Sequence, residues 1–158
     1  MIQRVQTIYL AIVIILLTIV TLGSELFSFV NETTRYTFNS YGIMKYDLAS
    51  GALLSKQTFP FYLGTIALIL LSFITLMSYK NLNRQFKLGR TVFGIYFLTL
   101  ITVVLLSTLG DNLLEVETTG REMGLGFFIF AVGFPFTFLA NTGIKRDKKL
   151  LDSLDRLR

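Results

Sequence analysis

The chain has 158 residues, enough for one domain, with 53% hydrophobic residues and a formal net charge of +5. It contains no cysteine and no histidine, which excludes disulfides, thiol catalysis, Cys- or His-ligated metal and histidine acid–base chemistry. We therefore predict no enzyme, no cofactor and no metal site, and we look instead at where the apolar and charged residues fall.

Four long stretches of the sequence carry no Asp, Glu, Lys or Arg. Each is about as long as the ~20 apolar residues that a helix needs to cross a bilayer. A single central charge would cost about 2.5–3.5 kcal/mol on an insertion scale, so the absence of charge is informative. The predicted spans are residues 6–24, 58–79, 91–110 and 123–143. A cleaved signal peptide is the alternative for the first span, but no A-x-A-like site follows it.

The segments between the spans differ in charge. Residues 80–90, the tail 144–158 and Arg4 hold 11 of the basic residues, whereas segments 25–57 and 111–122 hold four. Because Lys and Arg near span ends mark the cytoplasmic side, both termini, the turn 80–90 and the tail are predicted inside, and the other two loops outside. The positive charge is thus explained by topology, and we expect no nucleic-acid surface.

The first outer loop, residues 25–57, is rich in aromatic residues that favour strands. Turn-forming pairs stand at Asn31-Glu32, Asn39-Ser40 and Ser50-Gly51. These features predict two or three short antiparallel strands over the outer helix ends. The alternative is a partly ordered loop.

The fourth span and the tail carry the candidate contact residues. Small residues at Gly126, Gly133, Thr137 and Ala140 predict a helix-packing face, either within this chain or against another subunit. Pro135 should kink that span. After it, Leu150, Leu154 and Leu157 follow helical spacing and predict a short amphipathic helix. The candidate contacts of the tail with lipid or a partner are its basic residues, Lys145, Arg146, Lys148, Lys149, Arg156 and Arg158. A plain basic stop after the span is the alternative.

Both ends of the chain carry distinctive segments, which are Met1–Leu10 (MIQRVQTIYL), Leu139-Ala140-Asn141 with Ile144–Asp147, and Asp155–Arg158. These segments resemble a bacterial family catalogued as domain of unknown function 4293. The resemblance implies a small bacterial inner-membrane protein with four helices and no assigned activity.

Together these patterns predict an all-α membrane protein: a four-transmembrane-helix bundle with a small β-rich loop outside and a short amphipathic C-terminal helix. We expect a non-enzymatic accessory or scaffold subunit in the bilayer, bound to a membrane-protein partner or to a second copy. One alternative is a small transporter or channel component with a polar path along Thr99, Thr102 and Thr137. The other is a lipid-binding membrane protein.

Overall fold

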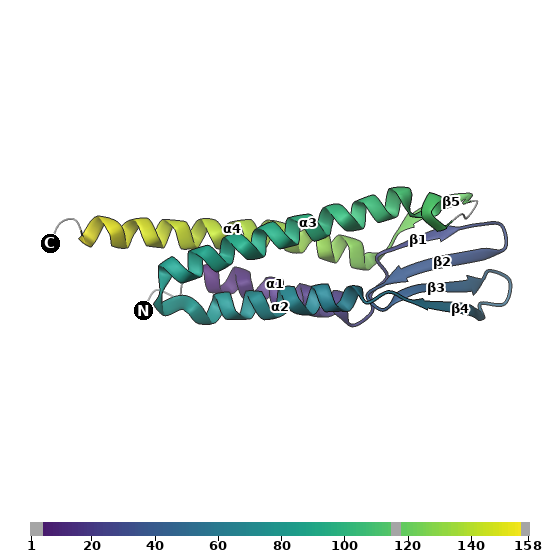
Figure 1. Ribbon diagram of the computed structural model, residues 1–158, viewed down its shortest axis with the longest axis horizontal. Coiled ribbons are helices and arrows are strands. Elements are labelled where there is room, and N and C mark those ends of the chain that lie inside the picture. Colours follow the sequence, from purple (N-terminus) through teal and green to yellow (C-terminus); the bar gives the residue numbers. More distant parts are fainter. Residues whose placement is uncertain (1–4, 115–117, 156–158) are drawn as a thin grey trace.

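The computed structural model of the chain describes residues 5–114 and 118–155. It has two parts, four helices that lie side by side and a β-sheet that continues from one end of them along the same axis (Figure 1). The beginning of the first helix and the end of the last helix both lie toward the end opposite the sheet (Figure 1).

The helices are α1 (Val5–Thr21), α2 (Phe61–Met77), α3 (Leu82–Leu114) and α4 (Leu125–Asp155). A 3₁₀ turn, Ser78–Lys80, joins α2 to α3. Helix α1 packs on α2 and α4, and α3 packs on the same two helices, so the four surround one shared core.

A repeat of 3.5 residues selects the buried side of every helix. In α1 the buried positions are Gln6, Leu10, Val13, Leu17 and Val20, and in α2 they are Phe61, Thr65, Leu68, Ser72 and Thr75. In α4 they are Gly126, Phe130, Gly133, Thr137, Ala140 and Ile144. Alternating steps of four and three are the pattern of helices that wrap around one another with interlocking side chains.

The buried positions are often small or polar, while the exposed ones are large and apolar. Exposed side chains include Leu98 at 65%, Leu70 at 57% and Phe138 at 55% of their full accessible surface. In water this arrangement would be unfavourable, because large apolar side chains gain by leaving solvent. In hydrocarbon it is expected, since small residues let helices approach closely and lipid covers the large ones.

Three helical segments are long and apolar enough to cross a membrane, Phe61–Lys80, Leu82–Gly110 and Leu125–Leu150. The described part of α1 is apolar but shorter, at 17 residues or roughly 25 Å. The three long segments indicate a membrane protein.

Among the described residues, five strands form one antiparallel sheet in the order β4-β3-β2-β1-β5. They are β1 (Phe27–Val30), β2 (Thr34–Asn39), β3 (Gly42–Asp47), β4 (Leu53–Thr58) and β5 (Gly120–Met123). The turns of the hairpins fall at the three pairs of turn-forming residues noted in the sequence. The β2–β3 turn is anchored to the helices, because the buried Ser40 hydroxyl donates to the Val20 carbonyl oxygen (2.7 Å).

The predicted all-α class is wrong, because the sheet is a second structural part of the protein and not a small feature of one loop. The segment after α1 makes four strands instead of two or three, and the loop between α3 and α4 adds β5 beside β1. That pairing joins residues 90 or more positions apart, such as Phe27 and Met123. Local sequence patterns carry no signal for it.

The short C-terminal helix predicted for the tail is helical as expected, but it is the continuation of the fourth span and not an element of its own. Helix α4 continues through Pro135 and past residue 144 to Asp155 without a break. Likewise α3 begins at Leu82, so most of the predicted turn 80–90 is helical. The core extends to this level, where Leu82 and Gln85 are buried, and this burial favours continued helix.

Candidate functional site

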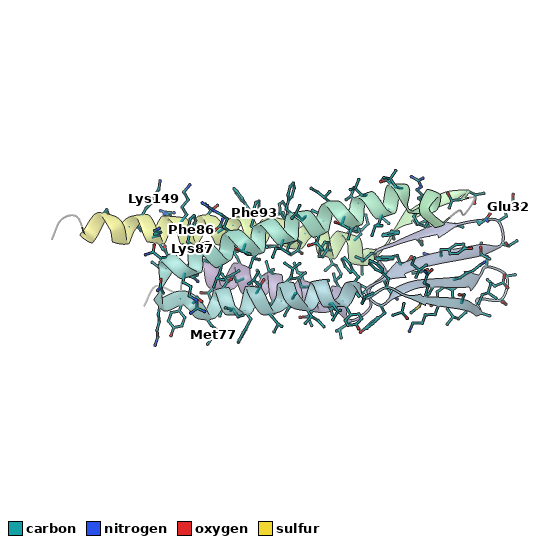
Figure 2. All side chains as sticks on the ribbon, viewed as in Figure 1. Glu32, Met77, Phe86, Lys87, Phe93 and Lys149 are labelled. Carbon is teal, nitrogen blue, oxygen red and sulfur yellow. The ribbon has the colours of Figure 1, made fainter. Side chains whose placement is uncertain are left out.

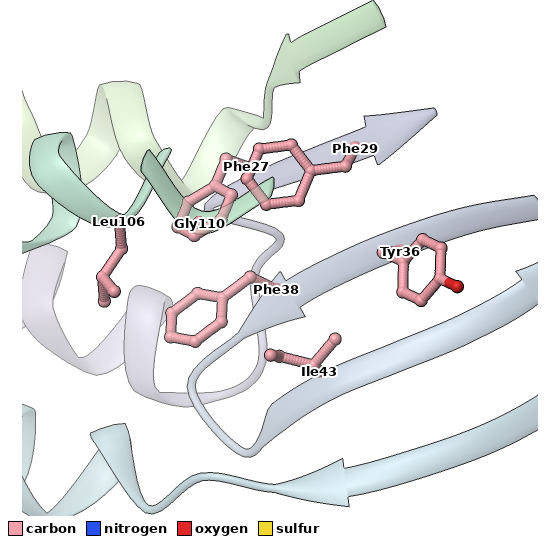
Figure 3. Close-up of a pocket in the computed structure, with 7 residues that line it drawn as sticks. All are labelled: Phe27, Phe29, Tyr36, Phe38, Ile43, Leu106 and Gly110. Atoms are coloured by element: carbon pink, nitrogen blue, oxygen red, sulfur yellow. The ribbon is translucent and has the colours of Figure 1, made fainter. Parts of the chain in front are cut away.

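A small cavity lies where the sheet meets the C-terminal end of α3. Its volume is about 100 Å³, and we call it the aromatic slot. The residues that line it are Phe27, Phe29, Tyr36, Phe38, Ile43, Leu106 and Gly110 (Figure 3). Nearly all of this lining is apolar, so the slot suits an apolar group rather than a polar substrate.

Strand register explains why these residues gather. Side chains alternate between the two faces of a strand, and directly paired residues share a face. Phe27 pairs with Phe38 and Phe29 with Tyr36, which places four aromatic rings on one face. The rings of Phe27 and Phe38 stack with centroids 4.8 Å apart. The exposed end of this face is more polar, because Lys45 pairs with Tyr36 and Arg121 with Phe29.

The same aromatic residues join the sheet to the helices. Phe38 meets Phe61 of α2 with ring centroids 6.0 Å apart, and Phe61 meets Phe130 of α4 at 6.3 Å. Phe130 in turn stacks on Tyr96 of α3 at 4.8 Å. The contacts therefore run without interruption from the slot into the helical core.

The opposite face of the sheet is polar. The Arg35 guanidinium contacts carboxylate oxygens of Glu25 (2.8 Å) and Glu122 (3.1 Å), so it links β2 to the chain before β1 and to β5. Nearby, a hydrogen bond from the Ser50 hydroxyl lowers the pKa of the Asp47 carboxyl below its usual value. The described residues contain no group of three or more His, Cys, Asp or Glu side chains that could hold a metal ion.

A buried polar layer occupies the end of the helices away from the sheet. We give this name to Gln6 of α1, Gln85 of α3 and Asn141 of α4. Both amide atoms of Gln6 and Gln85, and the Asn141 carbonyl oxygen, are buried without a hydrogen-bond partner among the described residues. Gly143 and Gly89 make room for them, since a Cβ on Gly143 would lie 3.3 Å from the Gln6 Cβ and one on Gly89 3.3 Å from Asn141 Oδ1. Each unpaired polar group costs about 1–3 kcal/mol in such a place.

Replacing Gln85 by methionine should raise the free energy of unfolding by about 1–2 kcal/mol, because it keeps the side-chain length and removes two unpaired polar atoms. The measurement is thermal unfolding of the purified protein in mild detergent. Gln57→Met is the matched control, since Gln57 is exposed and should show no gain. A loss of stability in Gln85→Met would contradict the prediction and reveal a bound water or ligand that pairs with Gln85.

The predicted packing stripe lies on the inner side of α4, where all four residues are buried. A Cβ on Gly126 would lie 2.7 Å from the Glu25 carbonyl oxygen, and Gly133 lies directly against the Tyr96 hydroxyl. Thr137 donates to the Phe134 carbonyl oxygen (2.6 Å). The stripe thus faces two parts of this chain, the connection between α1 and β1 and helix α3.

The predicted basic contact residues lie at the end of the protein remote from the sheet. Lys145, Arg146 and Lys149 are exposed, and the Lys148 amine is 5.7 Å from the centre of the Phe86 ring of α3. Figure 2 shows Lys87 and Lys149 at this end and Glu32 at the opposite one. Arg156 and Arg158 lie outside the described residues.

The three threonines of the predicted polar path do not converge. Thr99 and Thr102 donate to the backbone carbonyl oxygens of Ile95 and Leu98 within α3, and Thr102 is exposed while Thr137 is buried. Their hydroxyls therefore satisfy the backbone of their own helices.

Sequence reasoning missed both the aromatic slot and the buried polar layer. The alternation of Tyr36 and Phe38 with polar residues marked one face of a strand, but its partners from β1 and α3 are set by long-range packing. Gln6 lies at the margin of the first predicted span and Gln85 in the predicted turn 80–90, where polar residues ordinarily face water. Their sequence alone carries no sign of burial.

Apolar outward-facing helix surfaces, a core that includes small and polar residues, and a sheet at one end define an α-helical membrane protein with an attached antiparallel sheet. The chain belongs to the family described as Domain of unknown function (DUF4293), whose model matches residues 2–157. No curated protein matches the chain.

Proposed function

We propose that this protein is a non-enzymatic accessory or scaffold subunit of a bacterial inner-membrane complex, which presents its sheet outside the membrane to a different protein. The observation that carries this proposal is the edge strand β4. All six of its residues are exposed, and Leu53 and Leu54 expose more than half of their surface, 52% and 56%. An uncovered edge with apolar side chains is the usual template for adding a strand from another chain.

The outer edge of β4 offers free backbone groups of defined position. The Phe59 N–H donates to the Tyr41 carbonyl oxygen (3.2 Å), so the paired residues Gly42 and Thr58 do not bond each other. Alternation along an antiparallel ladder then directs the N–H and C=O of Thr58 and Lys56 away from β3. A partner strand would bond to these groups.

The geometry disfavours a second copy of this chain as that partner strand. The strands run along the same axis as the helices (Figure 1). Two copies inserted the same way round in a bilayer are related by a rotation about the membrane normal, which leaves their β4 strands parallel and at equal height. In a parallel ladder the bonding residues of one strand lie between those of the other, so the two strands must be staggered. At equal height, the N–H groups of one β4 strand would face the N–H groups of the other, and the C=O groups would face C=O groups. The β4 edge therefore suits an extended segment of a different protein.

The proposed orientation has the chain crossing the membrane four times with both termini in the cytoplasm. Exposed basic residues at the end remote from the sheet support it, since Lys and Arg concentrate on the cytoplasmic side. Helix α1 packs along α2 and α4 and would make the fourth crossing. The sheet would then lie outside.

The partner is tested by a photocrosslinking residue placed at position 53 in living cells. We expect one discrete adduct with a different protein, which also rebinds the purified chain in mild detergent. Lys56→Pro should reduce adduct and rebinding about tenfold, because proline removes the outward N–H, whereas edge strands tolerate proline. That factor corresponds to about 1.4 kcal/mol, or one to two hydrogen bonds.

Lys56→Ala is the matched control, since it keeps the N–H and should bind normally. The chain has no native cysteine, so Lys56→Cys also reports sidedness and should react with an impermeant maleimide in intact cells. Equal adducts in the proline and alanine variants, or an adduct made only with a second copy, would contradict the proposal.

A further inference from the structure

The aromatic slot has the size and lining of a site for part of an alkyl chain. Its volume is about 100 Å³, smaller than the ~150 Å³ engineered cavity that holds a benzene molecule, so it admits a stretch of chain rather than a whole ligand. Of the seven lining residues only Tyr36 carries a polar side-chain atom, and its hydroxyl points away from the helices (Figure 3). Water inside such a cavity would lack partners, so an apolar occupant is favoured.

The slot adjoins the surface of the protein that lipid covers. Its helical wall is formed by Leu106 and Gly110, on the last turns of the long apolar segment of α3. The neighbouring residues Leu105 and Leu109 each expose 51% of their surface. An acyl chain in the adjacent leaflet can therefore reach the slot along an apolar surface, whereas a ligand from solution would have to displace lipid or cross the polar part of the sheet.

Positive charge stands at the outer end of the same sheet face. The Lys45 amine lies 5.1 Å from the centre of the Tyr36 ring, and Tyr36 lines the slot. Arg121 of β5 pairs with Phe29 and shares that face by register. The face thus passes from apolar residues next to the helices to cations further out, which matches an amphiphile with an acidic headgroup.

We propose that the aromatic slot binds an acyl chain of an acidic phospholipid from the leaflet next to the sheet, with the lipid phosphate placed beside Lys45. The second chain of the lipid stays in the bilayer. This site would fix the height of the sheet above the membrane surface, and the proposal does not depend on a partner for β4.

The test uses the full chain in nanodiscs of phosphatidylglycerol or phosphatidylcholine, each doped with the same phospholipid carrying a photoreactive diazirine on one acyl chain. We expect adducts on the peptides that line the slot to be about fivefold more frequent in phosphatidylglycerol than in phosphatidylcholine. This factor corresponds to the ~1 kcal/mol that one cation contributes to binding an acidic lipid. Lys45→Gln should abolish this preference. Lys56→Gln is the matched control, because Lys56 lies on the other face of the sheet and should leave the preference unchanged.

Filling the slot separates chain binding from general lipid contact. Ile43→Phe should reduce slot adducts about tenfold in both lipids while adducts at the lipid-facing Leu98 stay constant. Leu106→Phe fills the slot from the opposite wall and serves if the first variant unfolds below the assay temperature. Slot adducts no more frequent than those at Leu98, or equal effects of Lys45→Gln and Lys56→Gln, would overturn the proposal.

Discussion

Gly133→Ala should destabilise the protein by about 1–3 kcal/mol, the usual cost of forcing extra volume into a packed core. The Tyr96 hydroxyl occupies the space where the new Cβ would be and donates to the Phe130 carbonyl oxygen (2.8 Å). Tyr96 is fully buried, so its ring has no free space to move into. The measurement is thermal or denaturant unfolding of the purified protein in mild detergent.

Tyr96→Phe should rescue most of this loss, because it removes the atom that collides and the next ring atom would be 3.2 Å from the new Cβ. We therefore expect Gly133→Ala to cost clearly less in the Tyr96→Phe background, which is a positive coupling in a double-mutant cycle. Gly94→Ala is the control, since a Cβ there meets nothing within 4 Å. Equal costs of Gly133→Ala in both backgrounds would show that Tyr96 does not determine the need for glycine.

Phe38→Ala should have the largest effect on the sheet, with an expected loss of about 3–5 kcal/mol. Phe38 is 4% exposed and its ring contacts Phe27 within the sheet and Phe61 of α2. Its removal would leave a cavity at the junction of the two parts. The sheet should then loosen from the helices, and backbone amides of β2 and β3 should exchange hydrogen for deuterium faster than those of α3.

Phe59→Ala provides the comparison for this prediction. Phe59 also lies near Phe38, with ring centroids 6.0 Å apart, but its side chain is 48% exposed. We expect its truncation to cost less than about 1.5 kcal/mol and to leave exchange in β2 unchanged. Similar losses in the two variants would show that burial at the junction does not set the stability of the sheet.

The buried polar layer and the aromatic slot lie at opposite ends of the helices and differ in what they imply. The slot offers an apolar volume with nearby positive charge, which defines the chemistry of an occupant. The polar layer offers unpaired amide groups, which any hydrogen-bonding species could satisfy. The slot therefore suits one class of ligand, whereas the unpaired amide groups of the layer do not distinguish among ligands.

The apolar segments and the turns follow from local properties of the sequence. An uncharged stretch of about 20 residues is a local property, and hydrocarbon makes every charge within it costly, so three long apolar helices could be foreseen from residues 58–79, 91–110 and 123–143. Turn residues such as those at Asn39-Ser40 act through their own backbone and neighbours, so the hairpin turns were foreseen too.

Which helix faces are buried, and how the sheet is completed, depend on contacts between residues far apart in the chain. Lipid accepts large apolar residues, so apolar side chains occur on both the lipid-facing and the core-facing sides of a helix. The sequence therefore does not distinguish Leu98, which is exposed, from Val103, which is buried. Strand β5 has four residues and forms because β1 lies beside it, through contacts that local patterns do not encode. The aromatic slot depends on both effects, since its walls come from β1, β2, β3 and α3, which meet only when helices and sheet pack together.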